Sequence, residues 1–466
     1  MIVRPAESDD MADKNNPPIL LAVTISSFLT PFMGSALNVA LPMIGREYSM
    51  SALALSWVIS SFLLAATITL VPLGRISDIY GRKKIFLYGA LIFTVSSSFC
   101  IWAPTSPVLI FSRVIQGIGG AMIFSTGTAL LISDYPQHKR GRILGINLAA
   151  VYSGLTIGPF VGGLLTHHFG WRYIFLFSVF MGVLIIFAIM RTAKQEHLEA
   201  RNERFDLAGS LLYGISLFSI MYGFSLLPSL TASGFILLGI ACLVFFITRQ
   251  LKISFPLLDI HLFIDNKVFA FSNLAALINY CATFSITFLL SIYLQHVKML
   301  SPAQTGFVLV AEPIVLAFCS PFAGRLSDRF EPQIIASIGM SLTVIGLTLL
   351  IFITPETSLR YIISCLILLG LGFALFSSPN VNATMSAVEN KFYGIASATL
   401  ATMRITGQMF SMGITMLVFA FILGQHTIAL ADNLLLIKSA RIIYFILAVI
   451  CTGGIFASAS RGKVHK

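Results

Sequence analysis

The chain has 466 residues, of which 57% are hydrophobic and only 11% are charged, and its mean hydropathy is +0.90. A soluble globular domain carries roughly 25% charged residues, so a soluble enzyme and a disordered protein are both excluded. The formal net charge of +11 does not indicate a nucleic-acid-binding protein, because the basic residues fall between long apolar segments. The composition is that of an integral membrane protein.

Fourteen apolar runs are long enough to cross a membrane as helices, since about 20 apolar residues span ~30 Å of hydrocarbon. We predict spans at 18–44, 52–73, 85–103, 107–133, 143–165, 173–190, 206–226, 233–248, 268–295, 301–324, 333–354, 361–386, 394–423 and 439–460. The segment before Pro18 is acidic and has no basic region typical of a cleavable signal peptide. We therefore expect the first run to remain as a span.

The distribution of Lys and Arg indicates the orientation. If the N-terminus is inside, most basic residues fall in cytoplasmic segments, as the positive-inside rule expects. The opposite side then holds only Arg46, Arg172, Lys298, Arg360, Lys438 and Arg441, and two arginines fall within spans. We expect a multi-pass protein of the cell (inner) membrane with both termini cytoplasmic.

Two short sequences each recur later in the chain, and the separation between the copies is nearly the same in both cases. Gly74-Arg-Ile-Ser-Asp78 follows the second span and Gly324-Arg-Leu-Ser-Asp328 the tenth, while Gly117–Ala121 in the fourth span matches Gly370–Ala374 in the twelfth. The pattern predicts an all-α protein of two six-helix bundles in parallel orientation, although Gly-rich strings can also recur by chance. We place a cytoplasmic tail at 1–17, the N-terminal bundle at 18–190, a linker at 191–205, a two-helix insert at 206–248, a second linker with the C-terminal bundle at 249–460, and a tail at 461–466.

The segment after the second span carries the most specific motif. Gly74 and Asp78 share a helix face, where Asp78 could meet a helix N-terminus or an arginine across the interface between the halves. The segment resembles the G-x-x-x-D-x-x-G-R-[KR]-[KR] motif of the major facilitator superfamily. The match comprises Gly74, Asp78, Gly81, Arg82, Lys83 and Lys84, and the second copy keeps Gly324, Asp328 and Arg329. The resemblance implies the major facilitator fold and a gating role for both copies.

Arg113 and Gln116 lie three residues apart in the fourth span and share one face. An arginine inside the membrane must face a partner or water. The two residues resemble the R-x-x-Q-G motif of the same superfamily, which implies a part in proton transfer. A purely structural pairing between helices is the alternative.

The fifth span carries a stripe of small residues. Its pattern G-x-x-x-G-P-x-x-G-G is formed by Gly154, Gly158, Pro159, Gly162 and Gly163. Such stripes let helix backbones approach closely, and Pro159 can kink the helix. The full pattern resembles the signature of the superfamily's antiporters, in which the stripe packs against the second span of the C-terminal half. We therefore expect contact with the span at 301–324.

Glu312 is the only acidic residue that falls in the middle of a predicted span. A carboxyl group in an apolar setting can bind and release a proton at physiological pH, and Pro313 next to it can bend the helix. We predict Glu312 as a proton-coupling residue and substrate-cavity residue, although a neutral structural role is the alternative. Arg404 is the second charge within the C-terminal spans and could be a counter-ion of Glu312, an anion site or a structural residue.

Further polar residues in spans could line a substrate cavity between the halves, and each could instead form a helix–helix hydrogen bond. These candidates are Asn38, Asn279, Tyr280, Asn380 and Asn382. The fourteen spans resemble the drug:proton antiporter branch of the superfamily. Met33 stands where multidrug members often carry an acidic residue, five positions before Asn38, and we include it among the cavity positions.

We predict a proton-coupled exporter of amphipathic small molecules or drugs that works by alternating access. The alternative is an exporter or facilitator of a lipid-like, anionic or zwitterionic metabolite or siderophore. No nucleotide-binding loop, hydrolase motif or metal-spaced Cys and His set occurs in the sequence, so we expect no enzyme activity, cofactor or metal. The expected partners are a small-molecule substrate, protons and membrane lipids, with no nucleic acid and a monomeric state.

Overall fold

The computed structural model describes residues 17–135, 137–192, 205–389, 393–424 and 433–462. Every regular element in these ranges is a helix, and fourteen helical segments are long and apolar enough to cross a membrane. The prediction of fourteen spans is therefore confirmed.

The first six spans form one group of helices. They are α1 (Pro17–Glu47), α2 (Ala52–Tyr80), α3 (Arg82–Ile101), α4 (Ser106–Asp134), α5 (Gln137–His168) and α6 (Arg172–Met190). Two further spans, α7 (Leu207–Leu226) and α8 (Leu230–Gln250), and the short helix α9 (His261–Asp265) follow.

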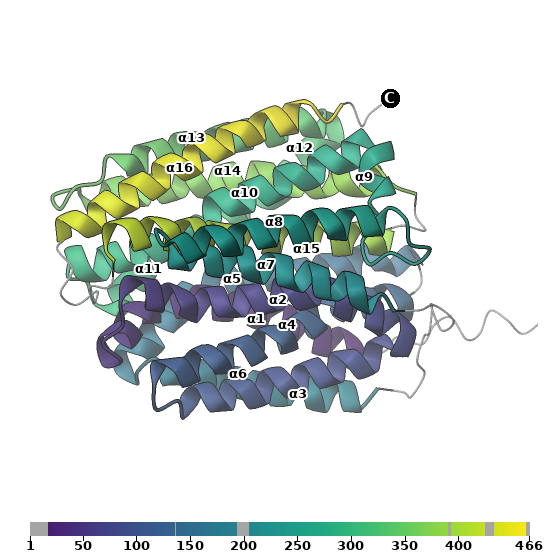
Figure 1. The fold of residues 1–466 in the computed structure, drawn as a ribbon, viewed down its shortest axis with the longest axis horizontal. Coiled ribbons are helices and arrows are strands. Elements are labelled where there is room, and N and C mark those ends of the chain that lie inside the picture. The colour runs from purple at the N-terminus through teal and green to yellow at the C-terminus, as the bar shows by residue number, and fades with distance from the viewer. Residues whose placement is uncertain (1–16, 136, 193–204, 390–392, 425–432, 463–466) are drawn as a thin grey trace, which may run out of the picture.

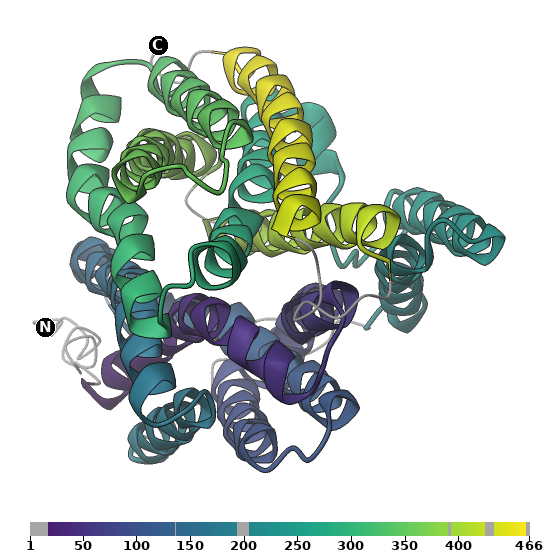
Figure 2. The same ribbon diagram turned by 90° about the vertical axis from the view of Figure 1, so that its left-hand side faces the viewer.

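The last six spans form the second group. They are α10 (Lys267–Ile292) continued by the π-helix η1 (Tyr293–Val297), α11 (Pro302–Leu309) with α12 (Ala311–Arg329), α13 (Pro332–Ile351), α14 (Leu359–Ser386), α15 (Tyr393–Ile422) and α16 (Asn433–Ala459). Figure 1 shows the helices nearly parallel across the molecule, and Figure 2 looks along them at two neighbouring bundles with α7 and α8 at one side. We call the end where α2 meets α3 the basic end, and the end where α1 meets α2 the opposite end.

The two bundles repeat the same close helix contacts. Gly117 of α4 packs on the main-chain carbonyl of Phe62 in α2, and Gly370 of α14 packs in the same way on the carbonyl of Glu312 in α12. Each glycine permits an approach that a Cβ atom would prevent. The packing therefore repeats the sequence duplication and makes Phe62 the N-terminal counterpart of Glu312.

The inserted helices are anchored at the basic end by a buried aspartate. Asp206 caps α7 by accepting a hydrogen bond from the amide of Gly209, and it also accepts hydrogen bonds from Arg249 and Gln250 at the end of α8. Burial alone raises the pKa of the Asp206 carboxyl, but the hydrogen bonds from Arg249, Gly209 and Gln250 outweigh it and leave the pKa lowered. Asp206 thus joins the two inserted helices as an ion.

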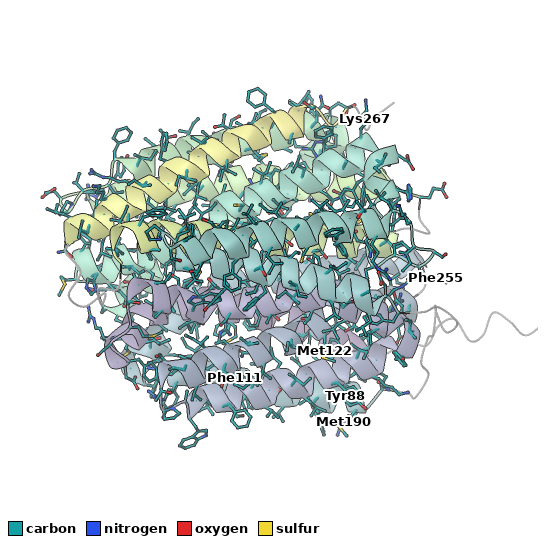
Figure 3. The ribbon with its side chains drawn as sticks, viewed as in Figure 1. Tyr88, Phe111, Met122, Met190, Phe255 and Lys267 are labelled. Carbon is teal, nitrogen blue, oxygen red and sulfur yellow. The ribbon has the colours of Figure 1, made fainter. Side chains whose placement is uncertain are left out.

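Helix α7 lies against both bundles, whereas α8 is largely exposed. The Cβ position of Gly214 in α7 lies 3.1 Å from Ile68 of α2, and that of Gly413 in α15 lies 2.9 Å from Met221 of α7. Large apolar side chains cover much of the outer surface, among them Phe111 and Met190 on the N-terminal bundle (Figure 3). An apolar outer surface is what contact with lipid requires.

Candidate functional site

Glu312 lies where the two bundles meet, at the start of α12. The helical path is interrupted at Val310, between α11 and α12, and Pro313 follows Glu312 directly. Because Pro313 has no N–H, the carbonyl of Leu309 loses its helical donor at this point. The main-chain carbonyl of Pro313 accepts a hydrogen bond of 3.1 Å from Thr156 of α5, so the N-terminal bundle contacts this break directly.

The face of α12 that carries Glu312 continues into a cluster of side chains from both bundles. Leu316 lies one turn after Glu312, and Phe373 of α14 packs beside it. Tyr152 and Leu155 of α5, Tyr280 of α10 and Cys319 of α12 complete this interbundle cluster. Tyr280 meets Phe373 edge to face at 5.3 Å between ring centroids. Residues four apart share a helix face, so the Glu312 side chain belongs to the same face as the interbundle cluster.

Arg404 lies near this cluster but does not pair with Glu312. Its guanidinium carbon is 5.8 Å from the ring centroid of Phe124 in α4, and its side chain also approaches the hydroxyl of Tyr280. Phe124 borders a small recess between α1 and α4, which is also lined by Ser26 and Thr128. Within the described residues, neither Glu312 nor Arg404 forms an ion pair. Of the three roles left open for Arg404, the described structure does not support that of counter-ion to Glu312, because Arg404 faces aromatic rings.

Arg113 and Gln116 form a buried network inside the N-terminal bundle. Arg113 donates to the carbonyl of Val58 in α2 at 3.0 Å and to the side-chain oxygen of Gln116, and its guanidinium stacks 4.4 Å from the ring centroid of Phe62. Gln116 in turn donates to Ser97 of α3 at 2.7 Å. These contacts hold three helices of one bundle together, and none of them joins Arg113 or Gln116 to Glu312.

The glycine stripe of α5 is divided between two partners. Gly154, Gly158 and Gly162 pack against residues 28–36 of α1, and only Pro159 and Gly163 contact α11, through Gly306 and Pro302. The expected contact with the span at 301–324 is therefore present, but only Pro159 and Gly163 make it, and the other three glycines pack inside the N-terminal bundle. The reason is the helical period: residues at i, i+4 and i+8 share a face, and Gly163 lies about 100° further around the helix than Gly162.

The motif at 74–84 forms the turn between α2 and α3 at the basic end. Asp78 accepts a hydrogen bond of 2.9 Å from Arg82 within the motif, and Lys83 donates to the carbonyl of Thr192 after α6. Gly81 has a φ of 109°, which a residue with a Cβ rarely adopts. Gly74 faces Ser125 of α4, as Gly324 faces Ser378 of α14. Asp328 and Arg329 close α12, and Lys84 lies in the first turn of α3.

The remaining cavity candidates differ in their surroundings. Asn380 is held between helices, because it donates to the carbonyl of Ser272 at 3.1 Å and accepts from Arg461 at 3.0 Å.

Met33 and Asn38 are buried in α1, with 2% and 3% of their surface exposed. Asn279 of α10 is fully buried, and neither polar atom of its side chain has a hydrogen-bond partner in the described structure. Asn382 donates to Ser327 at the basic end. Tyr280 and Arg404 are thus the predicted residues that approach each other, and Glu312 lies on the helix face that carries the interbundle cluster with Tyr280.

Comparison with known proteins decides the family. The family model described as Major Facilitator Superfamily matches residues 23–263 and 273–461. The chain belongs to the major facilitator superfamily. It is therefore a membrane transporter and not an enzyme. Its fold is similar to the crystal structure of a bacterial homolog to the human lysosomal transporter Spinster in an inward-facing and unoccupied conformation, with a TM-score of 0.66, 16% identity and 97% of each chain covered.

Relatives with similar sequences include transporters of different substrates. The chain is 29% identical to the riboflavin transporter RibZ of Clostridioides difficile, over 83% of this chain and 84% of the relative. It is 30% identical to the multidrug resistance protein Stp of Mycobacterium tuberculosis, over 83% of this chain and 73% of the relative. It is also 30% identical to the uncharacterized transporter YebQ of Escherichia coli, over 84% of this chain and 86% of the relative.

Sequence reasoning missed several residues by which the bundles of this superfamily member contact each other. Thr156 lies inside the quoted glycine pattern, yet only the structure shows its hydrogen bond to the Pro313 carbonyl. Ser291 and Gln295 of α10 and η1 bind main-chain carbonyls of α1. One sequence signal was available for Ser291, since Pro42 within α1 frees the carbonyl of Asn38, four residues before it.

Proposed function

We propose that this transporter exports amphipathic small molecules in exchange for protons by alternating access. The observation that carries the proposal is Glu312, a half-buried carboxyl group between the bundles with no ion-pair partner in the described structure. A group without a fixed counter-ion can exchange a proton without breaking a salt bridge. An ionisable residue within the membrane is energetically costly, and such residues generally mark functional sites, here a candidate site for proton coupling.

The position of Glu312 supports a link between protonation and bundle movement. The residue lies at the interruption between α11 and α12, and its neighbour Pro313 accepts the hydrogen bond from Thr156 of the other bundle. A change of charge at Glu312 acts on the same turn that joins the bundles. One proton that moves down ~150 mV provides roughly 3.5 kcal/mol, which corresponds to a substrate gradient of several hundred-fold.

The test is proton flux in liposomes that contain the purified transporter. Lipophilic cations are added to wild type, to Glu312→Gln and to the control Glu356→Gln, whose side chain is exposed in the loop between α13 and α14. We expect substrate-dependent proton flux in wild type and in the control, and none in Glu312→Gln. Normal flux in Glu312→Gln contradicts coupling at this residue, and absence of flux from wild type during substrate transport contradicts proton exchange altogether.

A second candidate substrate class follows from Arg404. Its guanidinium lies near Phe124 of one bundle and Tyr280 of the other, and no acidic side chain neutralises it in the described structure. Aromatic rings favour flat substrates, and an unpaired guanidinium favours an anionic or strongly polar edge. The similarity to a riboflavin transporter supports a planar aromatic metabolite of this kind, whereas the similarity to a multidrug resistance protein supports the first class.

The two classes are separated by competition between amphipaths of equal size and opposite charge. If the substrate is anionic or zwitterionic, anionic competitors inhibit transport more strongly, and Arg404→Gln removes this preference. The control is Arg360→Gln, which changes an exposed arginine at the start of α14. Preference for lipophilic cations that Arg404→Gln leaves unchanged supports the cationic drug class.

A further inference from the structure

At the opposite end, two side chains of the C-terminal bundle bind main-chain carbonyls of the N-terminal bundle. Ser291 donates a hydrogen bond of 2.6 Å to the carbonyl of Asn38, and Gln295 donates one of 2.8 Å to the carbonyl of Val39. Gln295 also donates to the Ser291 hydroxyl at 3.1 Å. Ser291 is fully buried and Gln295 is 6% exposed, so water does not compete at these bonds.

A proline in α1 supplies the acceptor. Pro42 lies four residues after Asn38 and has no N–H, so the Asn38 carbonyl receives no helical hydrogen bond. A buried carbonyl without a donor costs about 1–3 kcal/mol. The Ser291 hydroxyl of the other bundle satisfies this carbonyl. The position of Pro42 therefore decides which carbonyl of α1 needs a partner from outside its own helix.

A π-helical turn supplies the donors. The α-helix α10 widens into η1 at Tyr293–Val297, and π-helical turns within α-helices occur frequently at functional sites. Tyr293 in the same turn donates to the carbonyl of Thr354 at 2.6 Å, within its own bundle. The turn is thus bound to the C-terminal bundle through Tyr293 and to the N-terminal bundle through Gln295.

We propose that Ser291 and Gln295 form a lock that closes the opposite end of the transporter and that opens when the bundles separate there. The lock contains no charged group, and both of its acceptors are main-chain carbonyls. Water can hydrate all four groups once the bundles part, so the lock is reversible at a modest cost per hydrogen bond. The inference rests on alternating access and does not depend on proton coupling at Glu312.

The experiment measures the distance between spin labels on the two bundles at the opposite end. The labels are attached to cysteines at Thr105, before α4, and at Glu356, before α14, both exposed. The partly exposed Cys242 and Cys319 are replaced by alanine, since the other four cysteines are buried. The variants are Ser291→Ala, Gln295→Ala, their combination and Pro42→Ala. The matched control is Tyr293→Phe, which removes a hydrogen bond from the same turn but within one bundle.

We expect two populations of distance, with the short one predominant in wild type. Each single variant of the lock raises the ratio of long to short distances about fivefold, and the double variant raises it further. Pro42→Ala raises the ratio as well, because an alanine N–H can take the Asn38 carbonyl back into α1. Tyr293→Phe leaves the ratio unchanged.

Two different results overturn the inference and identify its failing part. If two populations are present but the double variant has the wild-type ratio, or Tyr293→Phe shifts it equally, Ser291 and Gln295 do not form the lock. If only one population exists in every variant, with and without transported substrate, alternating access at this end fails as well. Thermal unfolding of each variant shows whether it is folded before its distances are compared.

Discussion

The main-chain carbonyl of Glu312 lies directly against Gly370, at a distance that leaves no room for a Cβ atom on the glycine. The position of the coupling candidate is therefore fixed by α14, which brings the start of α12 into close contact. The N-terminal bundle has the same contact between Phe62 and Gly117, where an aromatic ring replaces the carboxyl group and stacks on Arg113. The duplicated scaffold thus places an acid in one bundle and a ring-covered arginine in the other.

Alanine at Gly370 is expected to disturb this contact. The new Cβ atom would meet the Glu312 carbonyl and would lie 3.0 Å from the Cβ atom of Val315. Overpacking of this kind costs about 1–3 kcal/mol, so Gly370→Ala lowers the melting temperature of the purified protein and weakens transport. Gly117→Ala has the same effect on stability, since it meets the carbonyl of Phe62.

The control for both variants is Gly453→Ala in α16. No atom lies within 4 Å of its Cβ position, and alanine is a better helix former than glycine. Gly453→Ala therefore keeps or slightly raises the melting temperature. Equal melting temperatures for Gly370→Ala and Gly453→Ala would contradict the close contact at Glu312.

The sequence predicted the helices better than the contacts between them. Long apolar runs and glycine or proline at their ends are local signals, so the fourteen spans agree with the helices in number and approximate position. Which side chains meet across the bundles depends on how each helix is rotated about its axis. Successive residues point about 100° apart around a helix, so neighbouring positions can face different helices. For this reason the sequence left three roles open for Arg404, and it did not show that three glycines of the α5 stripe pack on α1 while only Pro159 and Gly163 reach α11. Asn380 was a cavity candidate because it is a polar residue within a span. The sequence does not reveal its hydrogen-bond partner Arg461, which lies 81 positions away.

The Asp206 anchor predicts a loss of stability in acid. The pKa of Asp206 is lower in the folded protein than its ordinary value of 3.8, because hydrogen bonds from Arg249, Gly209 and Gln250 outweigh the effect of burial. Its stabilisation is therefore present above about pH 4 and is lost as the pH falls through the folded pKa. Melting temperatures measured from pH 6 down to pH 3 are expected to fall more steeply in wild type than in Asp206→Asn.

Asp265→Asn is the matched control for this pH series, because Asp265 is exposed at the end of α9. It should follow the wild-type curve. Asp206→Asn should lower stability at pH 6 by about 2 kcal/mol, since an ion that accepts several hydrogen bonds is lost. If the curve of melting temperature against pH for Asp206→Asn is parallel to that of wild type throughout, Asp206 does not titrate as the structure implies.

Arg461 is expected to hold the basic end of the C-terminal bundle together. It is 1% exposed and donates to Asn380 of α14, to Ser272 of α10 and to Ser458 of α16. Burial lowers the pKa of Arg461 to about 10, so the group remains charged at neutral pH. Arg461→Met removes these hydrogen bonds and should cost about 2–4 kcal/mol in unfolding experiments.

Arg360→Met, which changes an exposed arginine at the other end of the same bundle, serves as the control for Arg461→Met. It is expected to change the free energy of unfolding by less than about 0.5 kcal/mol. A similar small effect for Arg461→Met would show that its hydrogen bonds do not stabilise the folded bundle.

The two faces of the α5 glycine stripe are expected to respond differently to a larger side chain. Gly162 packs on Ala36 of α1, whose Cα and Cβ atoms lie 2.6 Å from the Cβ position, inside one bundle. Gly163 packs across the interface on Pro302 and Ala303 of α11, with the Pro302 carbonyl 2.6 Å away. Gly162→Val should therefore lower the melting temperature, because α1 and α5 cannot separate without unfolding the bundle. Gly163→Val should leave the melting temperature close to wild type, because the bundles can separate at the opposite end. It should raise the fraction of long distances between spin labels at residues 105 and 356. It should also abolish transport. The reverse order of the two melting temperatures, or an unchanged distance distribution in Gly163→Val, would show that the contact of α5 with α11 does not close the opposite end.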